Sequence, residues 1–252
     1  MASIPDALAV RLRSAARVAV LTGAGVSAES GVPTFRDALT GLWAKFDPRD
    51  LATPSAFARN PTLVWDWYAA RRETVKSVEP NPGHFAIATM ETLVGDFLLV
   101  TQNVDGLHAR AGSRKLVELH GNIARVRCSR EDRVVDAWHA SPDSLPPRCP
   151  HCGAFLRPDV VWFEEMLPAG ALEAAEAAAR RCDVFIVAGT SGEVYPAAAL
   201  PHYAKAAGAR VVEVNPDATP LSSLADDCLR GGSATVLPAL VEAAWPVSPK
   251  AG

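Results

Sequence analysis

Residues 18–28 read VAVLTGAGVSA, and this stretch decides the fold. Val18–Thr22 is a short apolar run with β-branched side chains, which is typical of a buried parallel strand. It continues directly into residues 23–28, a G-x-G-x-x-A turn. Because glycine has no Cβ atom, backbone N–H groups in such a turn can approach a pyrophosphate. Glycine turns after strands are common, so the turn predicts a dinucleotide site only together with the rest of the chain.

The remaining sequence alternates between predicted strands and helices. Four more short apolar runs are predicted as buried strands: Phe97–Thr101, Val184–Ala188, Val211–Val214 and Ala234–Leu237. Alanine-rich helical patterns lie between them, notably Ala171–Arg181 and Ala197–Ala207. This alternation predicts an α/β fold with a Rossmann-like, doubly wound parallel sheet.

Two stretches interrupt the alternation and predict a small second domain. Residues 39–82 hold a helical insert, whose main helix is expected to start at the cap Asn60 with Pro61 in its first position. Residues 125–158 are polar and proline-rich and contain three cysteines, which favours a zinc-ribbon-like insert. The large domain is then assembled from three segments: 1–38, 83–124 and 159–252.

Composition limits the possible functions. Of the 252 residues, 49% are hydrophobic and 21% are charged, which excludes a disordered chain. The net charge of -3 lacks the basic excess of a dedicated nucleic-acid binder. No apolar run approaches the length of a membrane span. Five cysteines, an odd number, indicate thiol or metal chemistry in a reducing compartment. We therefore expect a cytoplasmic monomer without membrane or specific nucleic-acid partners.

Small or polar residues follow three of the other predicted strands, at the carboxyl ends where open α/β sheets bind ligands. In chain order these residues are Gln102, Asn103 and Asp105, then Gly189, Thr190 and Ser191, then Asn215 and Asp217. A helix cap would explain Asp105 alone, but it does not explain the repetition at successive strand ends. The repetition predicts a dinucleotide bound across the top of the sheet.

Two further features are candidates for chemistry. His120 is followed by Gly121, which leaves room beside the ring. Histidine accepts a proton near neutral pH, since its usual pKa is about 6.5, although a single histidine is more often structural. The segment 29–37 combines glycine, proline, Phe35 and Arg36, a composition that suits a loop closing over a ligand to exclude water.

The blocks GAGVSAESGVPTFRD at 23–37 and TQNVDGLH at 101–108, with His120 and the later strand ends in order, resemble the sirtuins, which are NAD-dependent protein lysine deacylases. The resemblance implies NAD as co-substrate, acyl-lysine proteins as substrates, and His120 as catalytic base beside Asn103 and Asp105. It implies the following cofactor-binding residues: Gly23, Ala24, Gly25, Ala28, Phe35, Arg36, Gln102, Asn103, Asp105, Gly189, Thr190, Ser191, Asn215, Asp217 and Ala234.

The implied reaction consumes NAD. The acyl oxygen attacks the anomeric carbon of the ribose and expels nicotinamide. His120 then accepts a proton from the ribose hydroxyl, and the products are free lysine, nicotinamide and 2'-O-acyl-ADP-ribose.

The predicted insert helix carries Tyr68 and Arg71, three residues apart and therefore on one face. A guanidinium can pair bidentately with a carboxylate, and a phenol hydroxyl can assist it. On spacing alone, a solvated arginine beside an interfacial tyrosine is the simpler interpretation. Tyr-x-x-Arg at this place resembles the signature of class III sirtuins, which implies removal of succinyl, malonyl or glutaryl groups as well as acetyl.

The resemblance also implies two walls for the acyl-lysine channel. Val161 and Phe163 would form one, and Val194 and Tyr195 the other, with the substrate backbone added between them as a strand. The chain departs from the family pattern at Glu164, where a glycine is usual.

The predicted ribbon also departs from the pattern, because the family usually has two Cys-x-x-Cys pairs. Cys149 and Cys152 form one pair, whereas Cys128 is followed three residues later by Glu131. We expect a structural zinc on three thiolates, with Glu131, His139 or water as the fourth ligand. Cys182 and Cys228 are expected to be buried thiols.

Other functions remain open at this point. One is plain deacetylation or ADP-ribosyl transfer to a protein, with Tyr68 and Arg71 incidental. Another is a non-catalytic NAD sensor or a zinc-ribbon adaptor for nucleic acid. The charge balance argues against the adaptor, and the presence of His120 with Asn103 and Asp105 argues against the sensor.

Overall fold

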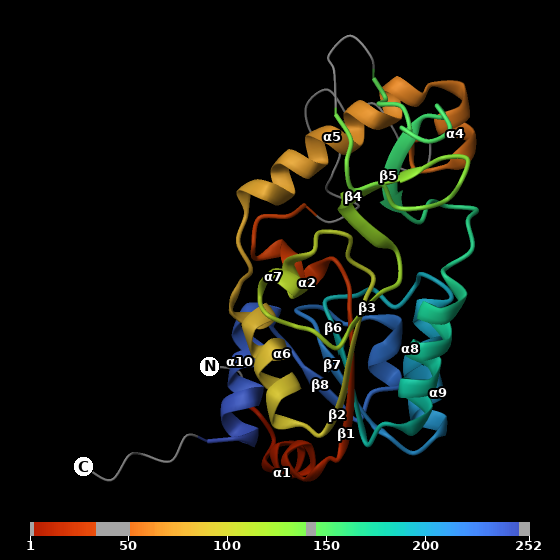
Figure 1. Ribbon diagram of the computed structural model, residues 1–252. Coiled ribbons are helices and arrows are strands. Elements are labelled where there is room, and N and C mark those ends of the chain that lie inside the picture. Colours follow the sequence, from red (N-terminus) through yellow and green to blue (C-terminus); the bar gives the residue numbers. More distant parts are fainter. Residues whose placement is uncertain (1–2, 34–50, 140–144, 247–252) are drawn as a thin grey trace.

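The computed structural model describes residues 3–33, 51–139 and 145–246. At its centre lies a six-stranded sheet with the order β3-β2-β1-β6-β7-β8, and all its neighbouring strands are parallel (Figure 1). The strands are β1 (Arg17–Thr22), β2 (Asp96–Thr101), β3 (Leu116–Glu118), β6 (Val184–Ala188), β7 (Arg210–Val214) and β8 (Asp227–Leu229). Winding reverses between β1 and β6, so the predicted doubly wound, Rossmann-like sheet is confirmed.

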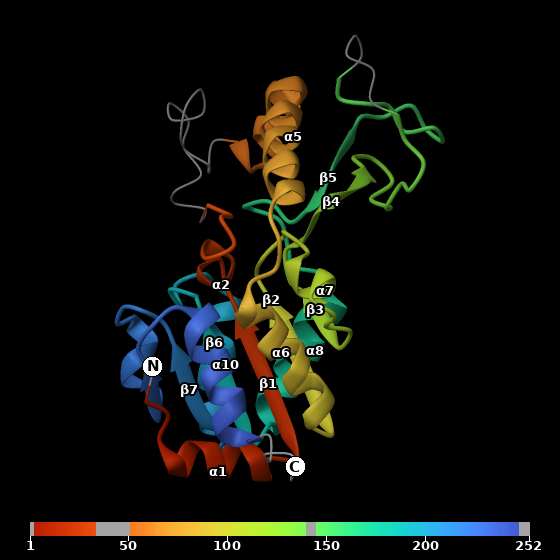
Figure 2. The ribbon, with the colours of Figure 1, turned by 90° about the vertical axis from the view of Figure 1, so that its left-hand side faces the viewer.

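Helices cover both faces of the sheet. One layer consists of α1 (Asp6–Ser14), α6 (Pro82–Leu93) and α10 (Ser233–Ala244), and Figure 2 looks onto it. The other consists of α8 (Ala169–Arg181) and α9 (Leu200–Ala206). Along β1, Val18 and Val20 pack into the first layer, whereas Ala19 and Leu21 pack into the second. Burial on both faces explains why residues 18–21 of this strand are all apolar.

A smaller part of the molecule lies beyond the carboxyl edge of the sheet, at the top of Figures 1 and 2. It contains α4 (Pro54–Arg59), α5 (Pro61–Ser77) and the antiparallel pair β4 (Gly121–Cys128) and β5 (Leu156–Val160). The predicted start of α5 is confirmed, because Asn60 Oδ1 accepts a 3.1 Å hydrogen bond from the Leu63 N–H. Trp65 of α5 packs edge-on against Trp138, with ring centroids 5.4 Å apart. Both inserts thus share one small core, while the exact domain boundaries stay a prediction.

Short elements complete the architecture. They are α2 (Gly25–Ala28), α7 (Leu107–Arg110) and the 3-10 segments η2 (Ala197–Ala199) and η3 (Pro220–Ser223). The strands β3 and β8 were not predicted, because three residues are too few to give a periodic signal.

Two sequence expectations are wrong. Ala234–Leu237 is the start of α10 rather than a strand. Its buried residues Val236, Leu237, Leu240 and Ala244 recur at helical spacing past Pro238, where the predicted strand ended. Cys182 is buried as expected, but Cys228 is exposed, since it lies on the edge strand β8, which has a neighbour on one side only.

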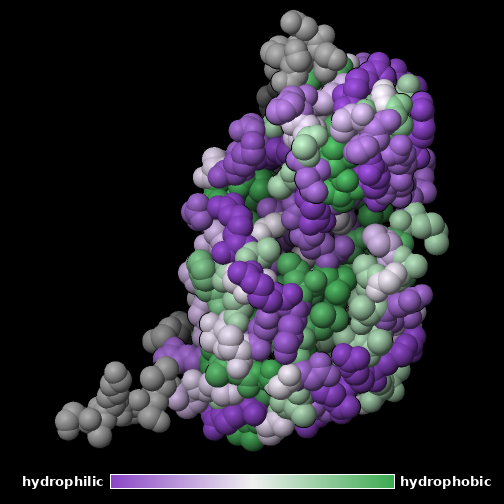
Figure 3. Space-filling view, in the orientation of Figure 1, coloured by the Kyte–Doolittle hydropathy of each residue, from purple (hydrophilic) through white to green (hydrophobic). Residues whose placement is uncertain are grey.

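The surface view places apolar residues mainly around the middle of the face shown, between the small part and the sheet, whereas the top is mostly hydrophilic (Figure 3). Within the described ranges, no helix combines the length and apolarity needed to cross a membrane.

Candidate functional site

The glycine turn after β1 lies at the point where the sheet reverses, beside the turn that follows β6. A Cβ atom on Gly25 would lie 2.8 Å from Gly189 Cα, and one on Gly23 would lie 2.7 Å from Thr190 Cβ. Gly189 has a φ of +60°, and its own Cβ would lie only 2.3 Å from Val26 N. The glycines therefore allow two backbone turns to pack against each other where a dinucleotide-binding sheet holds its ligand.

Backbone hydrogen bonds refine the expected phosphate contacts. Gly23 N–H donates to Ala188 O at 3.1 Å, and Gly25 N–H donates to Gly189 O at 2.8 Å. Both donors are thus used within the protein. Ala24 N–H has no acceptor among the described residues, which leaves it as the donor of this turn best able to reach a phosphate.

Ser27, on α2, connects this turn to the end of β2. Its hydroxyl donates a 2.8 Å hydrogen bond to Asp105 Oδ2 and accepts one of 3.1 Å from Asn103 Nδ2. Asp105 Oδ1 accepts a 2.9 Å hydrogen bond from the N–H of Leu107, the first residue of α7. Both predicted side chains, Asn103 and Asp105, are buried. Burial raises the pKa of Asp105, although the hydrogen bonds from Leu107 and Ser27 oppose this effect.

His84, at the start of α6, holds the other side of Ser27. The Asn81 N–H donates to His84 Nδ1 at 3.2 Å, so the ring proton must sit on Nε2. Nε2 lies 3.3 Å from Ser27 Oγ and donates to it. These hydrogen bonds therefore form a series with one direction of donation. It starts at the Asn81 N–H, passes through His84 and Ser27, and ends at the Asp105 carboxylate.

A second buried histidine packs beside the first. The rings of His84 and His108 are 4.7 Å apart, and His108 Nε2 lies 2.9 Å from Thr22 Oγ1, which in turn donates to Thr101 Oγ1 at 2.8 Å. Burial lowers the pKa of His84 to about 4 and, together with the neighbouring His84, lowers the pKa of His108 to about 3. Both rings are neutral at pH 7.

Sequence reasoning missed Ser27, His84 and His108 as parts of this site. Ser27 lies within the quoted turn, and Asn81-Pro82 before His84 is a helix-start signal that was available. The link between them depends on long-range contacts, which local pattern does not reveal.

His120 lies at the same edge of the sheet, and its Nδ1 is 2.9 Å from the Gln102 carbonyl oxygen. A carbonyl only accepts hydrogen bonds, so Nδ1 carries the proton and Nε2 keeps its lone pair. Burial lowers the pKa of His120, and the bond to Gln102 offsets this in part. The ring is therefore neutral and can act as a general base at neutral pH.

Residues predicted for the adenosine side are also close together. Gln102 Nε2 donates to Thr190 Oγ1 at 3.1 Å, and Asn215 Nδ2 donates to Thr190 O at 3.0 Å. Asp217 is exposed beyond this pair. Ala234 lies in the first turn of α10, where its N–H donates to Glu29 Oε2 at 2.7 Å. Ser191 lies in the turn that follows β6 and Ala28 is the last residue of α2, whereas Phe35 and Arg36 are outside the described residues.

Tyr68 and Arg71 lie together on α5, as predicted. Tyr68 is buried, and its hydroxyl accepts a 3.0 Å hydrogen bond from Trp162 Nε1. Burial raises the pKa of Tyr68, so the phenol keeps its proton. Arg71 packs over the Trp67 ring at 5.2 Å. Burial lowers the pKa of Arg71, while nearby Tyr68 and Asp105 raise it, which places the guanidinium within electrostatic range of the catalytic candidates.

One expected channel wall begins beside the histidine, since the Val161 N–H donates to His120 O at 2.9 Å. Further on, Phe163, Val194 and Tyr195 are exposed, with 42%, 47% and 70% of their surfaces accessible, as an apolar docking surface requires. Glu164 has a φ of +72°, the left-handed region that favours glycine.

The cysteines of the ribbon gather at one point. Ligand atoms of Cys128, Glu131, Cys149 and Cys152 all lie within 4.8 Å of one another, and the Cys128 and Cys152 sulfurs are 3.4 Å apart. Thiolates around a tetrahedral zinc, at 2.3 Å from the metal, are separated by about 3.8 Å. This donor set fits a structural zinc ion. His139 is outside the cluster.

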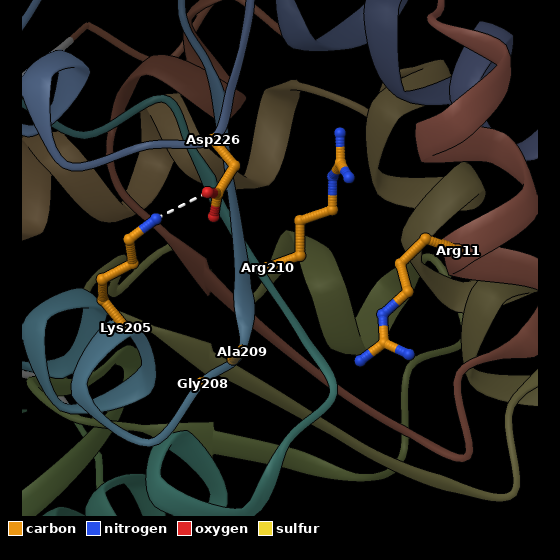
Figure 4. A pocket seen from close by; sticks show the side chains of 6 residues that line it. All are labelled: Arg11, Lys205, Gly208, Ala209, Arg210 and Asp226. Carbon is orange, nitrogen blue, oxygen red and sulfur yellow. Dashed lines mark hydrogen bonds and ion pairs between the residues drawn. The ribbon is translucent and has the colours of Figure 1, made fainter.

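A hollow of about 300 Å³ lies at the opposite, amino-terminal edge of the sheet (Figure 4). Its charged residues are Arg11, Lys205, Arg210 and Asp226. Lys205 pairs with Asp226 at 2.6 Å, and Arg210 pairs with Asp227 at 2.6 Å. Because these charges are largely neutralised and the hollow is remote from the predicted residues, we place no function there.

Comparisons with known proteins show which proteins the whole chain is similar to. The Sir2 family model matches residues 23–196. A curated protein of Ralstonia nicotianae, named NAD-dependent protein deacylase, is 54% identical over 240 residues, covering 95% of this chain and 97% of that protein.

Solved structures give the same result. A Sir2 homologue in complex with NAD has a TM-score of 0.90 and 46% identity, covering 96% of this chain and 94% of that one. A Sir2 protein bound to an acetylated peptide has a TM-score of 0.81 and 30% identity, covering 92% and 94% of the two chains.

Proposed function

This chain belongs to the Sir2 family and is an NAD-dependent protein lysine deacylase, and we propose that it acts preferentially on acyl groups that carry a negative charge, such as succinyl, malonyl or glutaryl. The observation that carries the proposal is Arg71, a partly buried guanidinium with no ion pair to any described residue. A desolvated cation without a counter-ion is costly, and a carboxylate on the substrate would supply one.

Tyr68 supports the same interpretation. Its oxygen accepts from Trp162, so its own proton is left to donate to a ligand. A phenol donor and a guanidinium on one helix face suit a carboxylate better than they suit the methyl group of an acetyl chain. The relative with an acetylated peptide binds acyl-lysine, and we infer that protein acyl-lysine is the substrate class here as well.

We assign the chemical steps to the residues at the sheet edge. His120 Nε2 accepts a proton from the ribose hydroxyl of NAD. Asn103 and Asp105, fixed by Ser27, orient the ribose and the nicotinamide. NAD supplies the leaving group and the acyl acceptor, whereas the protein supplies orientation and a neutral base. Phe163, Val194 and Tyr195 would hold the substrate backbone between them as an added strand.

The test compares succinyl-lysine and acetyl-lysine versions of one peptide. Charge-assisted hydrogen bonds contribute about 1.5–3 kcal/mol, so Arg71→Met should lower kcat/KM for the succinyl peptide by roughly 10- to 100-fold. The acetyl peptide should be affected much less. Lys76→Met removes an exposed positive charge from the same helix and serves as the matched control. Equal losses on both peptides, or none, would contradict a carboxylate-binding role.

Mass spectrometry of the products separates this activity from ADP-ribosyl transfer, because only deacylation releases 2'-O-acyl-ADP-ribose. We further propose a monomer located in the cytoplasm. The cysteines of the chain are all free in the structure, which is consistent with a reducing compartment.

A further inference from the structure

Two turns of the cysteine-containing ribbon have the same backbone design. The first starts at Cys128, where the Asp132 N–H donates to Cys128 O at 3.0 Å. The second starts at Cys149, where the Gly153 N–H donates to Cys149 O at 2.9 Å. Both turns end in the left-handed region, with φ values of +54° at Asp132 and +71° at Gly153. The two five-residue turns thus correspond residue by residue.

The correspondence extends to the residue three positions after each cysteine. In the first turn the Glu131 N–H donates to Cys128 Sγ at 3.4 Å. In the second turn Cys152 follows Cys149 by three residues, as Glu131 follows Cys128 in the first. Glu131 therefore occupies the position in its turn that Cys152 occupies in the other, which is the position of a metal ligand.

The Glu131 side chain completes the ligand set. One of its carboxylate oxygens lies within 4.8 Å of all three sulfurs, as the atoms around a single small ion must. Arg133 Nε donates to Glu131 Oε2 at 2.7 Å, which holds the carboxylate in place and leaves Oε1 available to a metal ion. Outer hydrogen bonds of this kind commonly orient carboxylate ligands of metals.

We propose that Glu131 is the fourth ligand of a zinc site made of three thiolates and one carboxylate, and that Arg133 positions it. Zinc accepts carboxylate oxygen at 2.0–2.2 Å as well as thiolate sulfur. A carboxylate carries the same charge as a thiolate, so the exchange leaves the charge balance of the site unchanged. Thiolates bind zinc strongly, and we expect this site to release its metal more readily than a four-cysteine site would.

Zinc binding by the full-length chain tests the proposal. Zinc content is measured by mass spectrometry after dialysis against a series of chelator concentrations. Loss of a residue that hydrogen-bonds a metal ligand typically weakens metal binding roughly 10- to 100-fold. Glu131→Gln removes the ligand itself and should weaken zinc binding by at least this factor, whereas Arg133→Met should weaken it less. Glu131→Cys should retain zinc at higher chelator concentration than the unmodified chain. Asp136→Asn removes an exposed carboxylate of the same ribbon outside the cluster, so it should match the unmodified chain.

Cobalt substitution gives a readout independent of affinity and of enzyme activity. Sulfur-to-cobalt charge-transfer absorption should increase in Glu131→Cys, because a fourth thiolate joins the ion. Glu131→Asp keeps the charge but withdraws the carboxylate by one methylene, so its ligand-field bands should differ from those of the unmodified chain. This variant provides the test if Glu131→Gln does not fold. Unaltered bands in Glu131→Asp, or unaltered zinc affinity in folded Glu131→Gln, would mean that water or another group is the fourth ligand and would overturn the proposal.

Discussion

Ser27 Oγ lies 2.8 Å from Asp105 Oδ2, and this bond joins the glycine turn after β1 to the polar residues after β2. The serine accepts from both Asn103 and His84, so its single proton has only the Asp105 carboxylate as acceptor. One hydroxyl thereby fixes an aspartate and an asparagine that are proposed to contact NAD.

Replacing Ser27 should therefore damage function as well as stability. Ser27→Ala leaves the buried Asn103 amide and the Asp105 carboxylate each without one partner, which should lower the free energy of unfolding by about 1–3 kcal/mol. The KM for NAD should rise at the same time, because the two side chains lose their common anchor. Denaturant unfolding and initial-rate kinetics measure the two effects. Ser77→Ala, which removes only a local helix bond, is the control and should change neither.

The paired histidines predict how stability depends on pH. The folded pKa values, about 4 for His84 and about 3 for His108, lie below the unfolded value near 6.5. At pH values between the folded and unfolded pKa of each histidine, the unfolded state therefore binds more protons than the folded state. Their contribution to stability is complete above pH 6.5 and is lost as the pH falls toward 4. The slope should reach about 1.4 kcal/mol per pH unit for each histidine.

Unfolding titrations from pH 7 to pH 4 measure this slope. His108→Gln keeps a donor for Thr22 but cannot titrate, so its stability should fall less steeply with acid than that of the unmodified chain. His202→Gln replaces an exposed histidine and should leave the slope unchanged. Equal slopes for all three proteins would show that the buried pair does not control the acid response.

The acid limb of the pH–rate profile should lie at a lower pH than the usual pKa of histidine, because His120 is the base. Its pKa is lowered by burial, and the base acts only when unprotonated, so kcat/KM should stay high until the pH falls below about 6.5. A pH–rate profile of acyl-ADP-ribose formation measures this limb. His120→Asn should abolish product formation while NAD still binds. An acid limb at or above pH 6.5, in a range where the protein stays folded, would contradict a buried neutral base.

Much of this architecture was predictable from the sequence, because most residues of β1, β2, β6 and β7 are buried between the two helix layers and are therefore apolar. The polar strand ends followed directly, since parallel strands bring their carboxyl ends to one edge. The helix cap at Asn60 was equally local.

What was missed depends on contacts between distant residues. Nothing near His84 in the sequence shows that it touches Ser27, 57 positions away. The run at Ala234–Leu237 suits a strand or a buried helix equally well, and only packing beyond Pro238 decides between them. The spacing of Glu131 from Cys128 already matched that of Cys152 from Cys149 in the sequence, but only the backbone of the two turns showed that they have the same geometry.

Two glycines with positive φ should respond differently to the same substitution. Gly189→Ala would place a Cβ atom 2.3 Å from Val26 N in addition to adopting a φ of +60°. Gly208→Ala, at a φ of +88°, meets no atom within 4 Å. We expect a loss of about 1–2 kcal/mol for Gly208→Ala from backbone strain alone. Overpacking should lower the free energy of unfolding of Gly189→Ala by roughly a further 1–3 kcal/mol. This variant should also bind NAD more weakly. Thermal unfolding and NAD titration make the comparison, and equal losses would mean that the two turns do not need their close contact.

Glu164 is an exposed position where glycine should stabilise this chain. Its φ of +72° imposes strain of about 1–2 kcal/mol on a residue with a Cβ atom, and the greater freedom of glycine in the unfolded state offsets part of the gain. Glu164→Gly should therefore raise the free energy of unfolding by up to about 1 kcal/mol. Glu173→Gly, at an exposed position inside α8, should lower it by about 0.5–1 kcal/mol, because glycine is disfavoured in a helix. Denaturant unfolding of both variants decides the matter. If Glu164→Gly is destabilising instead, the glutamate side chain must make contacts that outweigh the strain of its backbone.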